Sequence, residues 1–439
     1  MNSEFLSSAV HDLRFSAAEV KDDAAVSHKK RISSDFSIRE WSCNIGVLDR
    51  VGLTLPLYAR MLKNGDYTHL HPQAIAALDQ RRRDNEQRMS GMLLTFKQAT
   101  IALQQAGVRF ACVKGFSLIP EYLEELWQRH QIDFDLLVTP GDELRAQQAL
   151  EKLGYKLTAV AGDDERRLCI PMTRPIAHNA YLYNPQEGAA IELHSRFWEA
   201  GAEDFPLDCP CDAIEKATIH TLGSLSFPRL SRHHAFLYQI LHVFRHFLGS
   251  WARLLWLYEL AAFMHRYRND DALWRKVQAL LCTDTRLAEA AALVLLSVQN
   301  LFNCPIPPAL ESICTLPADS LVRLWIGRYA QRWLLTDMPG NKLNLLLHRH
   351  FFSDNHIWRR YLAGRLAPFG KRPILCERIE QNAAKSIAYR MANLRFQAAR
   401  IVHHLSTDAG FAVACIDWKL HLRSNHDVFP ANDLRRGES

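Results

Sequence analysis

The 439-residue sequence lacks the cysteine pattern of a zinc module or of a disulfide framework. Its ten cysteines include no C-x-x-C pair, and the closest two, Cys209 and Cys211, have a spacing that is poor for a zinc knuckle. Scattered cysteines favour reduced thiols, so we expect a cytoplasmic protein. The sequence also contains no H-E-x-x-H zinc motif, no internal repeat and no low-complexity segment.

Long apolar runs are absent as well. The longest, residues 290–302, is shorter than the roughly 20 residues that span a bilayer, and it contains Gln299 and Asn300. The first residues carry acidic side chains and no apolar core, which argues against a secretory signal. We therefore expect no membrane span. The formal net charge of +6 permits phosphate-bearing partners without requiring nucleic acid.

The composition, 48% hydrophobic and 23% charged, is that of a globular protein, and the length allows several domains. Glycine- and proline-containing breaks divide the chain into parts of different character. We expect a flexible polar arm (1–40), an N-terminal helical region (41–107), a mixed strand and helix region (108–230), a helical domain (231–338) and a basic helical C-terminal region (339–439).

The stretch from Phe110 to Val138 is the most informative part of the sequence. An apolar run, Phe110–Val113, leads into Lys114-Gly115-Phe116-Ser117 and then into a segment with helical spacing. A second strand-like run, residues 131–138, closes the unit. The glycine-containing turn between two apolar runs predicts a strand–turn–helix–strand arrangement.

Two aspartates lie in the second run. Because side chains alternate along a strand, Asp133 and Asp135 share one face. The side chains expected to point the other way, toward a core, are Ile132, Phe134 and Leu136. Two neighbouring carboxylates repel unless a cation or a proton lies between them, and Mg²⁺ or Mn²⁺ suits such oxygen ligands. The alternative is the solvated face of an edge strand.

A third carboxylate follows at Glu192. Residues 177–183 and 189–193 flank a glycine-containing loop and predict a hairpin, whereas the mixed-charge patch 163–167 predicts a loop. If the second hairpin arm lies beside the strand 131–138, Glu192 joins the two aspartates, and three carboxylates suffice to hold two divalent ions. Otherwise Glu192 is an ordinary surface residue of a strand.

From residue 232 the sequence is helical to near its end. His242 and His246 lie four apart on one helical face, a spacing that metal sites use, but structural packing of both rings is the preferred interpretation. Glu259 lies in an apolar helix and needs a partner if it is buried. We expect Arg245 or Arg253 to fill that role.

These motifs together resemble the uncharacterised nucleotidyltransferase family of the polymerase-beta-like superfamily, whose usual run is L-K-G, R-x-x-x-D-I-D-L-L-V and D/E-L-H. His178 falls where that family tends to place a histidine, and Glu259 stands near its usual aspartate. The resemblance extends roughly from residue 98 to 265. The matching segments are Val113-Lys114-Gly115, Arg129 with Asp133-Phe134-Asp135-Leu136-Leu137-Val138, and Ile191-Glu192-Leu193-His194.

The resemblance implies an α+β fold: a polymerase-beta-like nucleotidyltransferase mixed sheet with flanking helices, plus a largely α-helical C-terminal half. Residues 108–230 become the catalytic domain. The implied metal ligands and catalytic residues are Asp133, Asp135 and Glu192. The implied nucleotide-binding residues are Lys114, Gly115, Ser117 and Arg129, with His178 and His194 as further support around the metal site.

The implied reaction moves an NMP from an NTP to a hydroxyl or similar acceptor and releases pyrophosphate, with Mg²⁺ or Mn²⁺ in a two-metal mechanism. The acceptor is expected to be a small molecule, a peptide or a glycan intermediate. Two alternatives stay open. The basic C-terminal region favours a toxin-like nucleotidyltransferase acting on RNA, and a non-catalytic scaffold that binds a nucleotide or a partner is the third interpretation.

Overall fold

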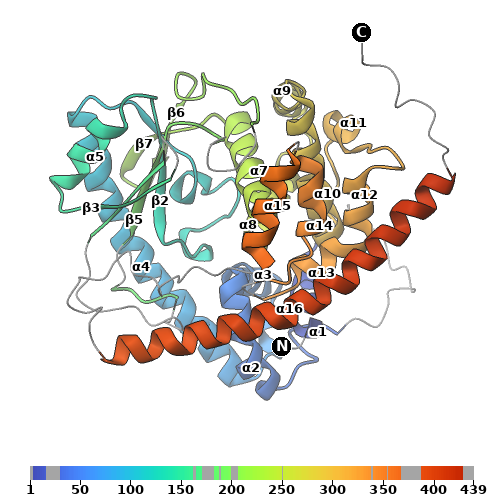
Figure 1. The fold of residues 1–439 in the computed structure, drawn as a ribbon. Helices are drawn as coiled ribbons and strands as arrows, with labels where there is room; N and C mark the ends of the chain where they lie inside the picture. The colour runs from blue at the N-terminus through green and yellow to red at the C-terminus, as the bar shows by residue number, and fades with distance from the viewer. Residues whose placement is uncertain are drawn as a thin grey trace, which may run out of the picture.

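Among the described residues, a mixed seven-stranded β-sheet with helices on both faces forms one part of the protein, and a helical C-terminal half forms the other (Figure 1). This arrangement confirms the α+β class predicted from the sequence. The computed structural model describes residues 3–15, 30–161, 165–170, 182–186, 189–198, 206–249, 251–337, 340–352, 354–366 and 387–428.

The strand order is β3-β4-β5-β2-β1-β7-β6, so the most apolar strands occupy the middle of the sheet. β2 is parallel to β5 and β1 is parallel to β7, whereas the other neighbours are antiparallel. The strands are β1 (Phe110–Cys112), β2 (Asp133–Val138), β3 (Lys156–Ala161), β4 (Glu165–Cys169), β5 (Ala190–His194), β6 (Thr218–Leu222) and β7 (Leu225–Arg229).

The neighbours of β5 differ from the expected hairpin. β5 lies between β2 and β4, and its antiparallel partner is β4, part of the mixed-charge patch that was expected to form a loop. That expectation was wrong because Glu165 and Arg167 point to one face of β4 while Leu168 on the other face is buried. Of the expected first hairpin arm, residues 177–181 fall outside the described residues, and Tyr183 lies in a turn.

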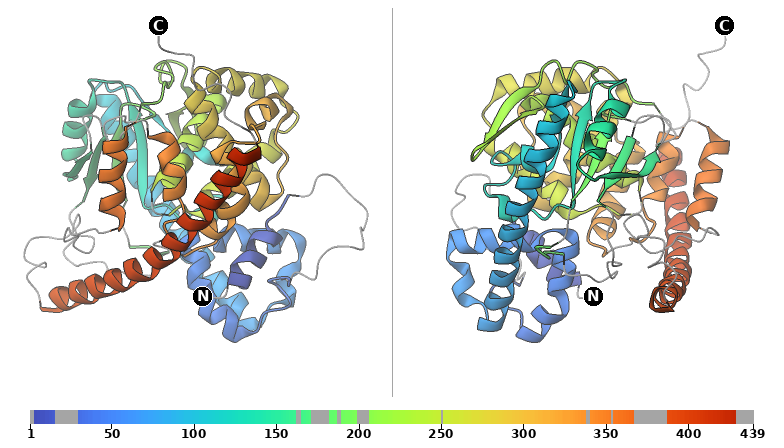
Figure 2. Two further views of the ribbon diagram at one scale, coloured as in Figure 1. Left: turned by 45° about the vertical axis from the view of Figure 1, so that its right-hand side comes forward. Right: turned by 90° about the vertical axis from the view of Figure 1, so that its left-hand side faces the viewer.

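The first five helices are α1 (Ser3–Asp12), α2 (Ile38–Val51), α3 (Thr54–Asn64), α4 (Pro72–Gln105) and α5 (Glu143–Glu151). α4 starts with proline in its first turn, which needs no backbone donor there, and it ends just before Gly107. It crosses one face of the sheet (Figure 2). There the ring of Phe96 packs against Phe116, Phe134 and Phe227 with ring centroids 5.0–5.3 Å apart.

The alternation predicted for β2 holds within the strand. Phe134 and Leu136 are buried in the core under α4. Ile132, which was expected to face the core, is 38% exposed, because the strand begins only at Asp133.

The remaining helices cover the other face of the sheet and form the C-terminal half. Residues from α1 to α16 share one hydrophobic core there, which also includes Ala111 of β1 and Leu137 of β2. These helices are α7 (Arg232–Leu248), α8 (Leu254–Arg266), α9 (Asp271–Leu281), α10 (Thr285–Phe302), α11 (Glu311–Cys314), α12 (Leu321–Trp325), α13 (Gln331–Leu334), α14 (Leu345–Phe351), α15 (Asn355–Leu366) and α16 (Ile387–Val428).

The beginning of the chain is packed onto this core. Phe5 and Leu6 of α1 are almost fully buried, and the ring of Phe5 meets Phe36 and Trp41 edge-on at 5.0 and 5.2 Å. The described part of the segment 1–40 is therefore docked rather than a flexible polar arm, because its few apolar side chains fall on one side of a helix. Among the described residues, no helix has the length and apolarity to cross a bilayer.

Candidate active site

Polar side chains from neighbouring strands gather on the sheet face that is opposite α4. Asp133 and Asp135 come from β2, and Glu192 and His194 come from β5. The parallel pairing of the two strands puts Asp135 directly beside Glu192. Each pair lies two residues apart along its strand, so all four side chains share the face. Sheet register thus brings together two acidic segments that are more than fifty residues apart in sequence.

The turn after β1 adds a lysine to this group. Gly115 has φ +64°, and a Cβ there would lie 2.6 Å from Oε1 of Gln131, so the turn requires glycine. The turn directs Nζ of Lys114 to Oδ1 of Asp135 at 2.6 Å. The hydroxyl of Ser117 donates to the carbonyl oxygen of Lys114 at 3.2 Å, so Ser117 supports the turn.

β4 contributes two residues that sequence reasoning missed. Arg167 lies opposite Glu192 and forms an ion pair with its Oε1. Oε2 of Glu165 lies 3.8 Å from Nδ1 of His194 and 3.7 Å from a guanidinium nitrogen of Arg245 on α7. The missed signal was the i, i+2 spacing of Glu165 and Arg167, which puts both on one face of a strand.

The charges of the group shift the pKa values of its members. Burial raises the pKa of Glu192 to about 7, with help from the negative charges of Asp133 and Asp135. Burial also raises the pKa of Asp133, and the charge of Asp135 adds to it. For Asp135, burial is outweighed by Lys114 and His194, which hold its pKa below the ordinary value. The three carboxylates therefore carry more negative charge than Lys114 and Arg167 neutralise.

A divalent cation would neutralise this excess negative charge. One ligand atom from each of Asp135, Glu192 and His194 lies within 4.8 Å of the others, and all three side chains are largely shielded from solvent. Lys114 and His194 both contact Oδ1 of Asp135, and Arg167 contacts Oε1 of Glu192. Nε2 of His194 also lies 3.9 Å from Oε2 of Glu192, so only Oδ2 of Asp135 is outside these ion pairs. Carboxylate oxygens suit Mg²⁺ and Mn²⁺, and imidazole is better suited to Mn²⁺ than to Mg²⁺.

The placement of Asp133 and His194 differs from the expected ligand set. Asp133 lies on the same face, one strand step before Asp135, but it is not in the compact group of three. His194, expected only to support the site, is in that group. Asp133 is partly exposed.

Arg129, four residues before Asp133, forms an ion pair with Glu259 of α8. Its Nε donates to Oε1 of Glu259 at 2.7 Å, and both side chains are buried. The partner of Glu259 is therefore Arg129 rather than Arg245 or Arg253. This contact turns Nε of Arg129 toward α8, and the nucleotide contact expected from sequence stays a prediction.

His242 and His246 of α7 pack against other rings, as the structural interpretation of their spacing predicted. The rings of His242 and His246 lie 4.8 Å apart and both meet Trp256. Nδ1 of His242 lies 3.5 Å from Nζ of Lys114. Burial and the charge of Lys114 lower the pKa of His246 to about 3, so the ring is neutral. His178 falls outside the described residues.

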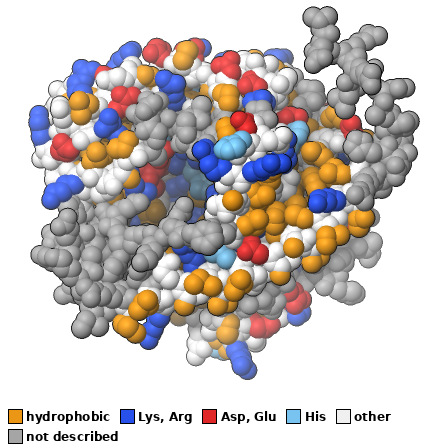
Figure 3. Space-filling view, in the orientation of Figure 1, with side chains coloured by type: hydrophobic (Ala, Val, Ile, Leu, Met, Phe, Trp, Pro, Cys, Tyr) orange, Lys and Arg blue, Asp and Glu red, His pale blue; other side chains and the backbone are white. Residues whose placement is uncertain are grey.

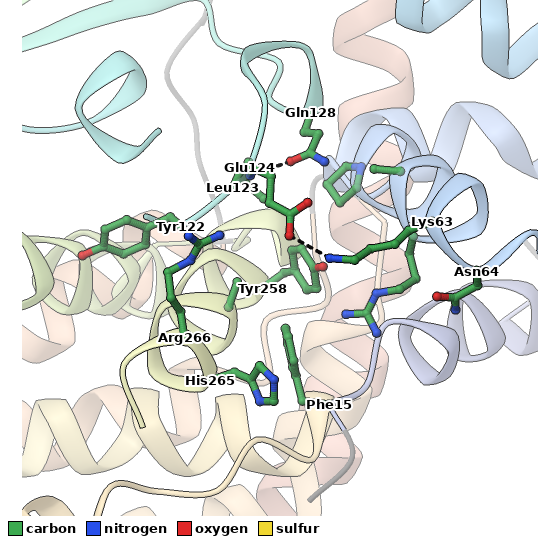
Figure 4. Close-up of a pocket in the computed structure, with 14 residues that line it drawn as sticks. Phe15, Lys63, Asn64, Tyr122, Leu123, Glu124, Gln128, Tyr258, His265 and Arg266 are labelled. Carbon is green, nitrogen blue, oxygen red and sulfur yellow. Dashed lines mark hydrogen bonds and ion pairs between the residues drawn. The ribbon is translucent and has the colours of Figure 1, made fainter. Parts of the chain in front are cut away.

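Figure 3 shows a hollow beside the sheet, on the side where the helical half begins, with basic side chains inside it. A separate cavity of about 310 Å³ lies between α3, the segment before Arg129, and α8 (Figure 4). It is lined by residues such as Lys63, Tyr258 and Arg266, and none of the acidic cluster lines it.

A mixed sheet with carboxylates on adjacent strands, covered by helices on both faces, is consistent with the nucleotidyltransferase class. The chain belongs to the uncharacterised nucleotidyltransferase family, whose model matches residues 37–303, more than half of its length. The match is wider than the segment that carries the motifs, since it includes α2 to α4 and α9 to α10. No curated protein and no solved structure was found to match.

Proposed function

We propose that this protein is a metal-dependent nucleotidyltransferase that moves an NMP from an NTP to a hydroxyl acceptor and releases pyrophosphate. The observation that carries the proposal is the pairing of Asp135 with Glu192 on parallel strands, with Asp133 on the same face. Membership of the family supports transfer of a nucleotidyl group in general. The excess of buried negative charge supports the requirement for a cation.

In this proposal Asp133, Asp135 and Glu192 hold Mg²⁺ or Mn²⁺, and His194 completes the set or orients Asp135. The bound ions would stabilise charge on the attacking and leaving oxygens of an in-line displacement. Alternatively, Asp133 and Asp135 hold the cation and Glu192, whose pKa is about 7 in the cation-free cluster, accepts the proton of the attacking hydroxyl. Its carboxylate lies beside Arg167 in the largely shielded part of the cluster.

In this proposal Lys114 and Arg167 bind the triphosphate. Each side chain pairs with one carboxylate oxygen of the cluster, so each lies beside the proposed cation site. With the cations bound at that site, both side chains would be near enough to contact phosphate oxygens. Lys114 would then offset charge on the leaving pyrophosphate, and Arg167 would offer a bidentate contact.

Replacement of Lys114 by methionine is expected to lower kcat by about 10²-fold, the effect of removing one preorganised donor from a charged transition state. Methionine keeps the apolar stem but leaves Asp135 without its buried counter-charge, so Tm is measured to show that the variant is folded. The measurement is pyrophosphate release under saturating NTP and Mn²⁺. Lys216→Met, on the exposed surface before β6, is the matched control and should leave kcat unchanged. Equal kcat values in the two variants would contradict the role of Lys114.

Binding of Mn²⁺ is expected to weaken at acidic pH. Below pH 7 Glu192 takes up a proton, which competes with the cation, so affinity at pH 6 should be about tenfold lower than at pH 8. Titration calorimetry of the wild type at both pH values provides the measurement. Glu192→Gln should bind Mn²⁺ weakly at both, whereas Glu311→Gln on α11 should behave as the wild type. A wild-type affinity independent of pH would remove Glu192 from the ligand set.

Incubation with each α-labelled NTP, Mg²⁺ and separate acceptor pools tests the proposal as a whole. The pools are small metabolites, peptides, glycan intermediates and RNA. We expect label on one of the first three pools, together with release of pyrophosphate. Label on RNA would favour the toxin-like activity, and nucleotide binding with no turnover in any pool would favour the scaffold.

A further inference from the structure

The outward side of α16 is a row of apolar side chains that the described chain leaves uncovered. In Figure 1 the helix crosses the front of the molecule as a ridge, and Figure 3 shows hydrophobic side chains along it. Eight large side chains are between 49% and 69% exposed: Met391, Leu394, Ile401, Val402, Leu405, Val413, Ile416 and Leu420. At about 100° per residue these positions fall within about a third of the helix circumference, so they form one stripe along the helix.

The opposite side of α16 is fixed to the protein. Phe411, Ala414 and Trp418 are buried in the main core. Asp408 forms an ion pair with Lys342, and Asp417 accepts a hydrogen bond from the hydroxyl of Tyr329. The helix is therefore held with a defined orientation, and its apolar stripe faces outward. Soluble monomers rarely expose such a contiguous patch unless it binds a partner.

We propose that this stripe binds the same stripe of a second copy of the chain, with the two α16 helices antiparallel. In an antiparallel pair centred on Ala409, Leu405 meets the partner's Val413 and Val402 meets the partner's Ile416, so the central part of the stripe is self-complementary. Such mutual contacts are those of a two-fold interface. Ala409 and Gly410 lie at the centre, where small side chains let two helices approach closely.

The available area agrees with a dimer. A large aliphatic side chain buries roughly 60–120 Å² in full. Eight such side chains at the observed exposures offer on the order of 500 Å² of apolar area per copy. A stable interface buries about 800 Å² per partner, of which about 65% is apolar in homodimers. The five side chains from Val402 to Leu420 that this register pairs offer on the order of 300 Å², more than half of the apolar area that a homodimer needs.

The charges along α16 favour a protein partner over a lipid surface. Helices that lie on membranes carry many Lys and Arg residues beside the apolar face. Between residues 394 and 420, α16 exposes Arg395 and Lys419, and Arg400, His403 and His404 are partly exposed. The side of the helix opposite the stripe packs against the protein. The stripe itself contains no charged side chain, so it suits a second apolar helix.

The test is the molar mass of the full-length protein by light scattering and sedimentation. Wild type should be a dimer at micromolar concentration. Leu405→Lys and Val413→Glu should each halve the mass, because each buries an unpaired charge in the interface. An equimolar mixture of the two variants should re-form dimers, since the opposite charges face each other in an antiparallel pair.

Ile219→Lys is the matched control, because Ile219 is 70% exposed on β6, away from α16, and it should leave the mass unchanged. Far-UV circular dichroism and Tm report whether each variant stays folded. A monomeric wild type overturns the proposal, whether or not it binds anionic vesicles. Dimers that persist in both folded variants also overturn it, and failure of the mixed variants to pair overturns the antiparallel arrangement.

Discussion

Nucleotidyl transfer is expected to fall by about 10³-fold or more in both Asp133→Asn and Asp135→Asn. Each substitution removes one charged ligand from the proposed cation site. Loss of several kcal/mol of transition-state stabilisation corresponds to this factor at about 1.4 kcal/mol per tenfold. The measurement is release of pyrophosphate at saturating NTP. Asp319→Asn, at an exposed position before α12, is the control that should retain full activity.

Asp133→Asn and Asp135→Asn should lose activity to a similar extent but should differ in stability. The charge of Asp133 is disfavoured by burial and by Asp135, so Asp133→Asn should raise Tm of the cation-free protein. Asp135→Asn breaks the buried pair with Lys114 and should lower the free energy of unfolding by about 3–5 kcal/mol. Full turnover in folded Asp133→Asn or Asp135→Asn would end the catalytic interpretation of the aspartates.

Glu259→Gln is expected to lower the free energy of unfolding by about 3–5 kcal/mol, because it leaves the guanidinium of Arg129 buried without its counter-charge. Denaturant unfolding monitored by tryptophan fluorescence provides the measurement. Activity should fall as well, since Arg129 precedes β2 by only a few residues and loss of its anchor alters the position of Asp133.

A double variant tests whether the lost stability comes from the unpaired charge of Arg129. Arg129→Met with Glu259→Leu removes both charges and should recover most of the stability lost in Glu259→Gln, because apolar replacements of a buried pair are often neutral. Glu289→Gln, at the partly exposed contact with His350 on α14, is the surface control and should change stability by less than about 1 kcal/mol. An unchanged free energy of unfolding in Glu259→Gln would contradict the prediction, because it would mean that the Arg129 guanidinium does not need the charge of Glu259.

Patterns of neighbouring residues predicted much of the site. The alternation along residues 131–138 was sufficient to put Asp133 and Asp135 on one face, and the same rule put Glu192 beside His194. The alternation failed at Ile132, where the strand had not yet begun. The mixed-charge patch was misassigned because local composition favoured a loop, whereas pairing with β5 made it a strand.

Such local patterns could not predict which side chains form ion pairs across the sheet or between helices. Arg167 beside Glu192 depends on the order of strands, and Arg129 beside Glu259 joins positions 130 residues apart. Several arginines near Glu259 in sequence were equally plausible partners, and distance in sequence gave no means to choose among them.

The sequence by itself determined which side chains share a face, because the period of a strand or helix is a local property of the backbone. It also determined the turn at Gly115, which only glycine can form beside Gln131. The tertiary structure alone decided which faces meet: that β2 lies parallel to β5, that Lys114 neutralises Asp135, and that the stripe of α16 faces outward. These contacts come from packing the whole chain around one core, and no short segment contains that information.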